Sequence, residues 1–147
     1  MSSERGVTLL ELVIVAAIAG VIATISFPGV TSGLDSLRLS QASDSLAAFL
    51  NTAINHAERR QAAVAVTLDA AQNTVWMHST EPGFVRKLTL PEGVRVAVES
   101  PEPRRFLILP GGAPPGFGVE LTNRRGSRRM VRIDPRLGLA SGLPVER

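Results

Sequence analysis

The hydrophobic positions of the chain fall into three patterns, and each predicts a different element. The first pattern is a continuous apolar run from Val7 to Phe27, which contains a single charge at Glu11. A helix rises about 1.5 Å per residue, so this run would reach about 31 Å, close to the hydrocarbon thickness of a bilayer. The run therefore predicts a membrane-spanning helix over residues 7–27, preceded by a short polar segment over residues 1–6.

The second pattern is a spacing of three and four between apolar residues over residues 34–62, which predicts an amphipathic helix. Between the two helices lie Pro28 and two glycines, and we expect residues 28–33 to form a linker that ends or weakens the helix. The apolar stripe should pack on a sheet. The opposite face should lie in water, and its polar residues are Ser43, Asn51, Asn55, Glu58 and Arg59.

The third pattern alternates with a period of two and predicts a β-rich domain over residues 63–147. Glycine and proline separate its segments, and the first two segments form a hairpin, as do 116–123 and 128–134. A helix on a mainly antiparallel sheet gives an α+β fold. The predicted strands are 63–68, 73–79, 84–90, 94–100, 104–110, 116–123 and 128–134, with a short strand after Gly138.

Composition and charge exclude several kinds of functional site and show where the positive charge lies. The chain has 147 residues and no cysteine, which excludes disulfides, thiolate metal sites and a catalytic thiol. The net charge is +3, and the whole surplus lies in residues 101–147, which carry nine arginines against four acidic residues. Within this region six arginines form a cluster: Arg124, Arg125, Arg128, Arg129, Arg132 and Arg136.

Glu11 requires an explanation, because an acidic side chain inside a spanning helix costs about 2.5 to 3.5 kcal/mol. One interpretation places the carboxylate at the lipid headgroups, near the positive end of the helix dipole. The other pairs it with a cation. The nearest basic side chain on the C-terminal side is the distant Arg38, whereas an N-terminal amine would serve if the chain began at Val7.

The stretch RGVTLLELVIVAAIAGVIA resembles the prepilin signal of type IV pilins and type II secretion pseudopilins. The resemblance implies that prepilin peptidase cleaves between Gly6 and Val7 and that the new amine of Val7 is methylated. It assigns Glu11 to pairing with the Val7 amine of a neighbouring subunit, which removes two isolated charges at once. Val7 departs from the phenylalanine that usually begins the mature chain in such families.

The same resemblance implies roles for the rest of the helix. Leu12 and the apolar residues that follow it would pack against helices of other subunits, and Pro28 stands where pilin-like proteins commonly have a proline. In the free monomer, Glu11 and the Val7 amine lie one helical turn apart and can pair within the chain. Assembly would exchange this pair for one between subunits.

The remainder of the chain resembles the soluble domain of the GspH/FimT family, on the segments TAINHAERRQAAVAVTL, FLILPGGAPPGFGVELTN and VRIDPRLGLASG. The strand LPEGVRV and the ending IDPRLG favour the H-type minor pseudopilin of type II secretion. The resemblance implies a single-pass protein of the bacterial inner membrane with a periplasmic domain. Its partners would be other minor pseudopilins, the major pseudopilin, prepilin peptidase and, before assembly, inner-membrane lipid.

Catalysis, cofactors and metal binding are not expected. The two histidines, His56 and His78, have no nucleophile or metal-ligand signature around them. The glycine-rich stretch 111–118 lacks the Lys-Ser or Lys-Thr pair of a phosphate-binding loop, and prolines interrupt it. We expect Trp76 and Phe106 to pack in the core or between strands.

The arginine cluster leaves three alternatives open. It could bind DNA phosphates, as in some FimT-like minor pilins of type IV pili that take up DNA. It could contact an acidic partner subunit, which we favour over DNA because aromatic residues are only 4% of the chain and base stacking has little support. It could also be a solvated hairpin tip. A further alternative for the whole chain is an anchored periplasmic domain that never polymerises.

Overall fold

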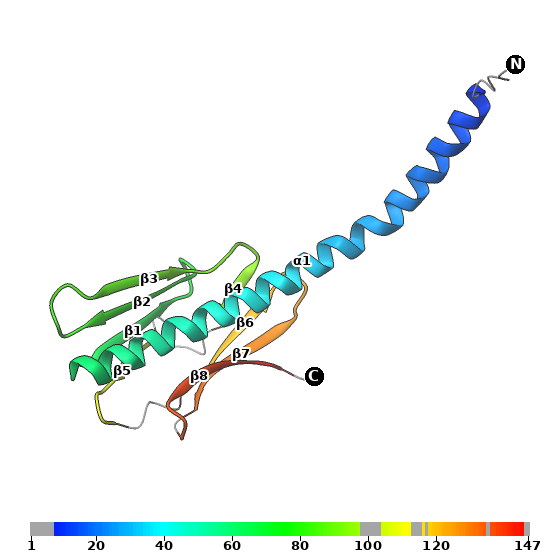
Figure 1. The fold of residues 1–147 in the computed structure, drawn as a ribbon. Helices are drawn as coiled ribbons and strands as arrows, with labels where there is room; N and C mark the ends of the chain where they lie inside the picture. The colour runs from blue at the N-terminus through cyan, green and yellow to red at the C-terminus, as the bar shows by residue number, and fades with distance from the viewer. Residues whose placement is uncertain (1–7, 98–103, 113–115, 117, 135, 146–147) are drawn as a thin grey trace, which may run out of the picture. The chain divides into compact units, whose positions relative to one another are not determined.

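A computed structural model describes residues 8–97, 104–112, 116, 118–134 and 136–145, without the side chains of residues 25–32. These residues divide into two compact units, Met1–Leu34 and Asp35–Arg147. Figure 1 shows their helix and strands. The bounds are α1 Leu9–Arg60, β1 Val64–Asp69, β2 Thr74–Ser79, β3 Val85–Thr89, β4 Val94–Ala97, β5 Arg104–Ile108, β6 Gly118–Asn123, β7 Arg128–Asp134 and β8 Leu139–Pro144.

The helix α1 continues through residues 28–33, so it does not end in the predicted linker, and the weakening of the helix there stays a prediction. A proline inside a helix removes one backbone hydrogen bond and costs about 3 kcal/mol, and each glycine costs about 1 kcal/mol relative to alanine. These penalties are local. Because apolar and amphipathic helical sequence lies on both sides, the turns before and after Pro28 keep their own hydrogen bonds, and the helix remains continuous.

The second unit contains two antiparallel sheets, where the sequence predicted one (Figure 1). The strand order is β3-β2-β1-β5 in the first sheet and β4-β6-β7-β8 in the second. All the predicted strands are present, and both predicted hairpins form, with β1 paired to β2 and β6 to β7. The split arises from two pairings between strands distant in sequence, β1 with β5 and β4 with β6.

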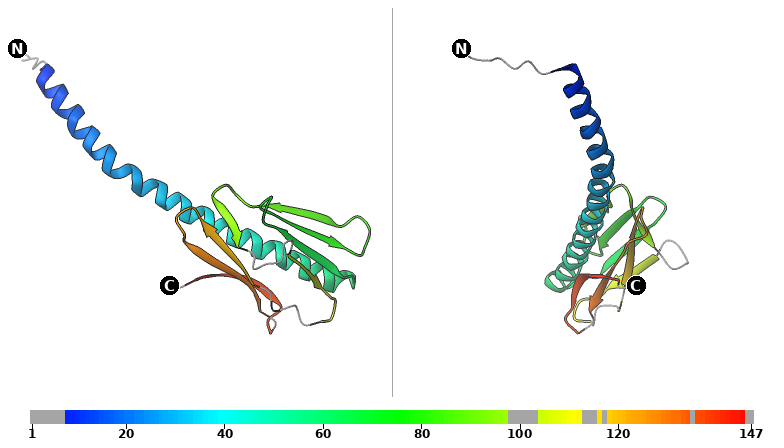
Figure 2. Two further views of the ribbon diagram at one scale, coloured as in Figure 1. Left: turned by 180° about the vertical axis from the view of Figure 1, so that it is seen from behind. Right: turned by 90° about the vertical axis from the view of Figure 1, so that its right-hand side faces the viewer.

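The second half of α1 packs on both sheets through the predicted apolar stripe (Figure 2). Leu46 and Leu50 are completely buried at its centre, and alanines at 42, 53 and 57 allow close approach of the strands. Phe49 is only partly buried against this core. Both sheets contribute their inward-facing residues to the same cluster, so α1 and the two sheets share one hydrophobic core.

Two residues predicted to face water, Ser43 and Asn51, instead contact β8. Ser43 is fully buried, and a Cβ atom added at Gly142 would collide with its Oγ. Asn51 Nδ2 donates to the carbonyl oxygen of Ala140 at 3.0 Å, and the Ala140 amide donates to Asn51 Oδ1 at 2.7 Å. The prediction was wrong because the side-chain amide of Asn51 replaces a neighbouring strand at the edge of β8.

The described residues of the ending IDPRLG, Asp134 and 136–138, belong to a tight turn between β7 and β8. Asp134 Oδ1 accepts hydrogen bonds from the amides of Arg136 at 2.8 Å and Leu137 at 3.4 Å. The Gly138 amide donates to the Asp134 carbonyl oxygen at 2.8 Å, and Gly138 has a φ of 64°, a conformation that glycine adopts at no steric cost. Aspartate and glycine at this spacing therefore fix the start of β8.

Candidate functional site

The N-terminal unit begins with a helix cap that positions Glu11. Thr8 precedes the first helical residue, and its Oγ1 accepts a hydrogen bond from the Glu11 amide at 3.3 Å. The Leu12 amide donates to the Thr8 carbonyl oxygen at 3.2 Å. The Glu11 side chain thus lies in the first turn and is exposed, where the helix dipole favours a carboxylate.

Thr8 was not among the predicted site residues, although the Thr8-x-x-Glu11 spacing is that of a capping box and could have indicated it. Two predicted residues, Gly6 and Val7, lie outside the described residues, and so does the side chain of Pro28. The pairing of Glu11 with an N-terminal amine therefore stays a prediction.

The first helical turns expose their apolar side chains in every direction. Leu12 is 60% exposed and Ile14 50%. A run of this kind far exceeds the scattered apolar residues that a soluble surface normally shows. The exposed set is Leu9, Leu10, Leu12, Val13, Ile14, Val15, Ile18, Val21 and Ile22. Across the described part of the chain, no helix combines the length and apolar character needed to cross a membrane.

The six clustered arginines do not converge on one site. Arg124 and Arg125 lie in the β6–β7 turn, and Arg125 Nε is 3.4 Å from Asp35 Oδ2 on α1. On β7, Arg128 Nε is 3.3 Å from Glu120 Oε1. Arg129 is half-buried on the opposite side of that strand, because successive side chains of a strand alternate. Arg128 and Arg129 thus point to opposite sides of β7, and Arg125 and Arg128 are paired with carboxylates.

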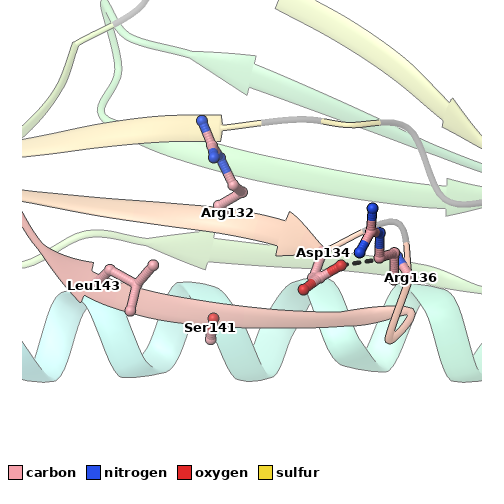
Figure 3. Close-up of a pocket in the computed structure, with 5 residues that line it drawn as sticks. All are labelled: Arg132, Asp134, Arg136, Ser141 and Leu143. Atoms are coloured by element: carbon pink, nitrogen blue, oxygen red, sulfur yellow. Dashed lines mark hydrogen bonds between the residues drawn. The ribbon is translucent and has the colours of Figure 1, made fainter.

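The remaining two arginines of the cluster line a pocket of about 410 Å³ together with Asp134, Ser141 and Leu143 (Figure 3). Figure 3 shows Arg136 beside Asp134, with Arg132 set apart from both. The carboxylate of Asp134 is held in the wall of this pocket by the turn that it builds. An anion in the pocket would therefore meet an acidic group as well as two cations, which makes it a weak phosphate site.

Neither histidine lines this pocket, since His56 lies on α1 and His78 on β2. His56 stacks on Phe84, with ring centroids 3.6 Å apart, and its Nε2 is 3.5 Å from Glu81 Oε2. His78 lies on β2 and is exposed. Within the described residues, no group of three or more histidine or acidic side chains is placed to hold a metal ion.

Comparison with known proteins gives a match at the N-terminal end of the chain. Residues 1–27 match the family model described as the prokaryotic N-terminal methylation motif. No curated protein and no solved structure matches the chain. The matched segment contains Gly6, Val7 and Glu11, and it includes the start of α1, whose second half packs on antiparallel sheets. Residues 1–27 are therefore a type IV pilin-like prepilin signal at the start of an α+β chain.

Proposed function

We propose that the chain is a minor pseudopilin of a type II secretion system. It is cleaved between Gly6 and Val7, methylated at Val7 and anchored in the inner membrane through residues 7–27. It then joins other minor pseudopilins to the major pseudopilin in the periplasmic pseudopilus. The observation that carries the proposal is the methylation motif, which has an exposed carboxylate in the first turn of a helix with exposed apolar side chains.

The physical reason is the cost of an isolated charge. A carboxylate at depth in lipid costs about 2.5 to 3.5 kcal/mol, and a free terminal amine at similar depth is also unfavourable. Pairing Glu11 with the Val7 amine of a neighbouring subunit removes both penalties and fixes the axial position of one helix against the next. The apolar side chains around Leu12 supply packing between helices, whose contacts alone would tolerate several registers.

Replacement of Glu11 by alanine or glutamine tests this pairing. We expect normal membrane insertion, normal cleavage and an N-methylated Val7 by mass spectrometry, but about tenfold less of the chain in sheared pseudopili, equal to about 1.4 kcal/mol of assembly free energy. Glu92→Ala, at an exposed position in the turn before β4, is the matched control and should assemble normally. Normal incorporation of both Glu11 variants, or an intact leader on assembled wild-type chain, would overturn the proposal.

The other reading of the same signal is a minor pilin of a type IV pilus. A chromosomal deletion separates the two functions, because both machines use prepilin signals but have different outputs. We expect loss of protein secretion with unchanged pilus assembly and unchanged DNA uptake. Loss of pili or DNA uptake with normal secretion would identify a pilus subunit, and no effect on either process would favour an anchored domain that does not polymerise.

A further inference from the structure

The outer face of the sheet β3-β2-β1-β5 carries apolar residues at positions where a sheet face in contact with water normally has polar ones. Its inner face contributes Val66 and Met77 to the core shared with α1. An antiparallel sheet with one buried face normally alternates apolar residues inward and polar residues outward. Here the outward positions include a cross-strand row of Val85, His78, Ala65 and Leu107, in which three of the four residues are apolar.

This row forms an exposed apolar surface. Val85 is 54% exposed and Leu107 47% exposed, on the two edge strands of the sheet. Ala65 in the middle is only 5% exposed, so the exposed apolar side chains lie at the two ends of the row. Four strands spaced about 4.8 Å apart give the row a width of about 14 Å.

A second cross-strand row runs beside the first and carries the charge. Trp76 pairs with Lys87 on one side and with Thr67 on the other, and Thr67 pairs with Arg105. The Lys87 ammonium lies over the Trp76 ring, 4.9 Å from its centroid. The row therefore places one cation at each end, about 14 Å apart, with the chain's single tryptophan between them.

The charge on this face is not balanced within it. Lys87 and Arg105 are both exposed, and neither has a carboxylate partner among the described residues. The acidic residue on the outward side of β1 is Asp69, at the strand end, where its Oδ1 accepts a hydrogen bond from the Gln72 amide. The face thus combines exposed apolar side chains at its two edges with a tryptophan and two cations, and tryptophan and arginine are enriched in protein interfaces.

We propose that this outer face, defined by Val85, Trp76, Lys87, Arg105 and Leu107, docks a protein partner that presents carboxylates beside an apolar patch. The two cations, Lys87 and Arg105, favour a partner with negative charge on its binding surface. Carboxylates would pair with the two cations, and apolar side chains of the partner would cover Val85 and Leu107 at the two ends of the first row. The proposal does not depend on filament assembly, since no residue of the prepilin signal contributes to this face.

The tryptophan makes the face directly observable. The chain has one tryptophan and no tyrosine, so its near-ultraviolet emission reports on Trp76 alone. The probe is a short synthetic peptide of alternating leucine and glutamate, titrated into the full-length chain in a non-ionic detergent. We expect a saturable change in Trp76 emission. A leucine and lysine peptide of the same length should give none, since its charges match those of the face.

Charge reversal tests the two cations. In the double variant Lys87→Glu and Arg105→Glu we expect about tenfold or greater loss of peptide affinity. The matched control is Arg95→Glu with Arg132→Glu on the outer face of the other sheet, which should bind as wild type. If the first double variant does not fold by circular dichroism, Thr67→Glu places a carboxylate between Trp76 and Arg105 and should weaken binding in the same direction.

Three results would overturn the proposal. The first is no saturable change with the acidic peptide. The second is an equal response to the lysine peptide, which would show apolar contact without charge selection. The third is binding of oligothymidylate with equal sensitivity to the Lys87 and Arg105 reversals while the acidic peptide fails, which would identify a nucleic-acid surface.

Discussion

Replacement of Asn51 by alanine should destabilise the β domain by removing the side chain that occupies the edge of β8. Asn51 accepts a hydrogen bond from the Ala140 amide and donates one to its carbonyl oxygen, at 2.7 and 3.0 Å. Both groups point away from β7, which pairs with the other side of β8. The following outward positions are Gly142, packed against Ser43, and Pro144, which has no amide proton. The side chain of Asn51 is therefore the main hydrogen-bonding partner of this edge.

The magnitude follows from two bonds in a half-buried site. A hydrogen bond in a folded protein contributes about 0.5 to 1.5 kcal/mol net, and a buried group left unpaired costs about 1 to 3 kcal/mol. Water can reach the vacated site in part, because Asn51 is only half-buried. We therefore expect Asn51→Ala to lower the free energy of unfolding by about 2 kcal/mol, a change of about thirtyfold in the folding equilibrium.

Asn51→Asp distinguishes the two bonds. A carboxylate still accepts from the Ala140 amide but opposes the Ala140 carbonyl oxygen, so at neutral pH it should destabilise at least as much as alanine. Once protonated, the same group can donate to that carbonyl. The folded-state pKa of the introduced carboxyl should therefore be raised, and the stability it contributes should appear at low pH and be lost as pH rises through that pKa.

The measurement is urea unfolding of the full-length chain in a non-ionic detergent, followed by Trp76 emission. Asn55→Ala, one turn further along α1 and exposed, is the control and should change stability by less than about 0.5 kcal/mol. If Asn51→Ala also falls within about 0.5 kcal/mol of wild type, β8 does not depend on the side-chain amide.

The remaining predictions concern packing and charge. Gly142→Ala should cost about 1 to 3 kcal/mol in urea unfolding through its collision with Ser43 Oγ, and Ser43→Ala should restore most of the loss, since this hydroxyl has no described hydrogen-bond partner. Leu46→Ala, at a fully buried site, should cost about 2 to 5 kcal/mol; a loss under 1 kcal/mol would contradict the described core. Replacing Arg128 and Arg132 by alanine should change DNA retention in filter binding by less than about twofold at low and high salt.

Short-range patterns in the sequence predicted the strands and the buried stripe of α1, because each depends on residues close together in the chain. The division into two sheets could not be predicted this way. It depends on β1 pairing with β5 and β4 with β6, and several alternative pairings of the same strands would satisfy the same alternation. Long-range pairing, unlike strand periodicity, leaves no local signal.

Two of the errors on α1 concern the exposure of polar residues. Polar side chains were assigned to water, but Ser43 is buried against β8 and Asn51 binds its backbone. Asn51 satisfies the amide and carbonyl groups at the sheet edge, whereas Ser43 is buried without a described hydrogen-bond partner, so polarity alone does not indicate exposure. The separation of Arg128 and Arg129 could have been predicted from the sequence. The two residues are adjacent on one predicted strand, and successive side chains of a strand point to opposite faces.

The two units differ in how their apolar residues leave water, and this difference bears on the role of Glu11. The second unit builds a hydrophobic core from its own apolar residues, whereas the first turns of α1 expose theirs. In lipid those side chains are already removed from water, so moving the helix into a filament gains little from the hydrophobic effect. Packing between helices supplies adhesion in the proposed filament but little preference for one register. In that proposed filament the charge at Glu11 would supply the preference, because only one axial position would place it beside an amine, and every other position would leave it unpaired in a medium that penalises isolated charge.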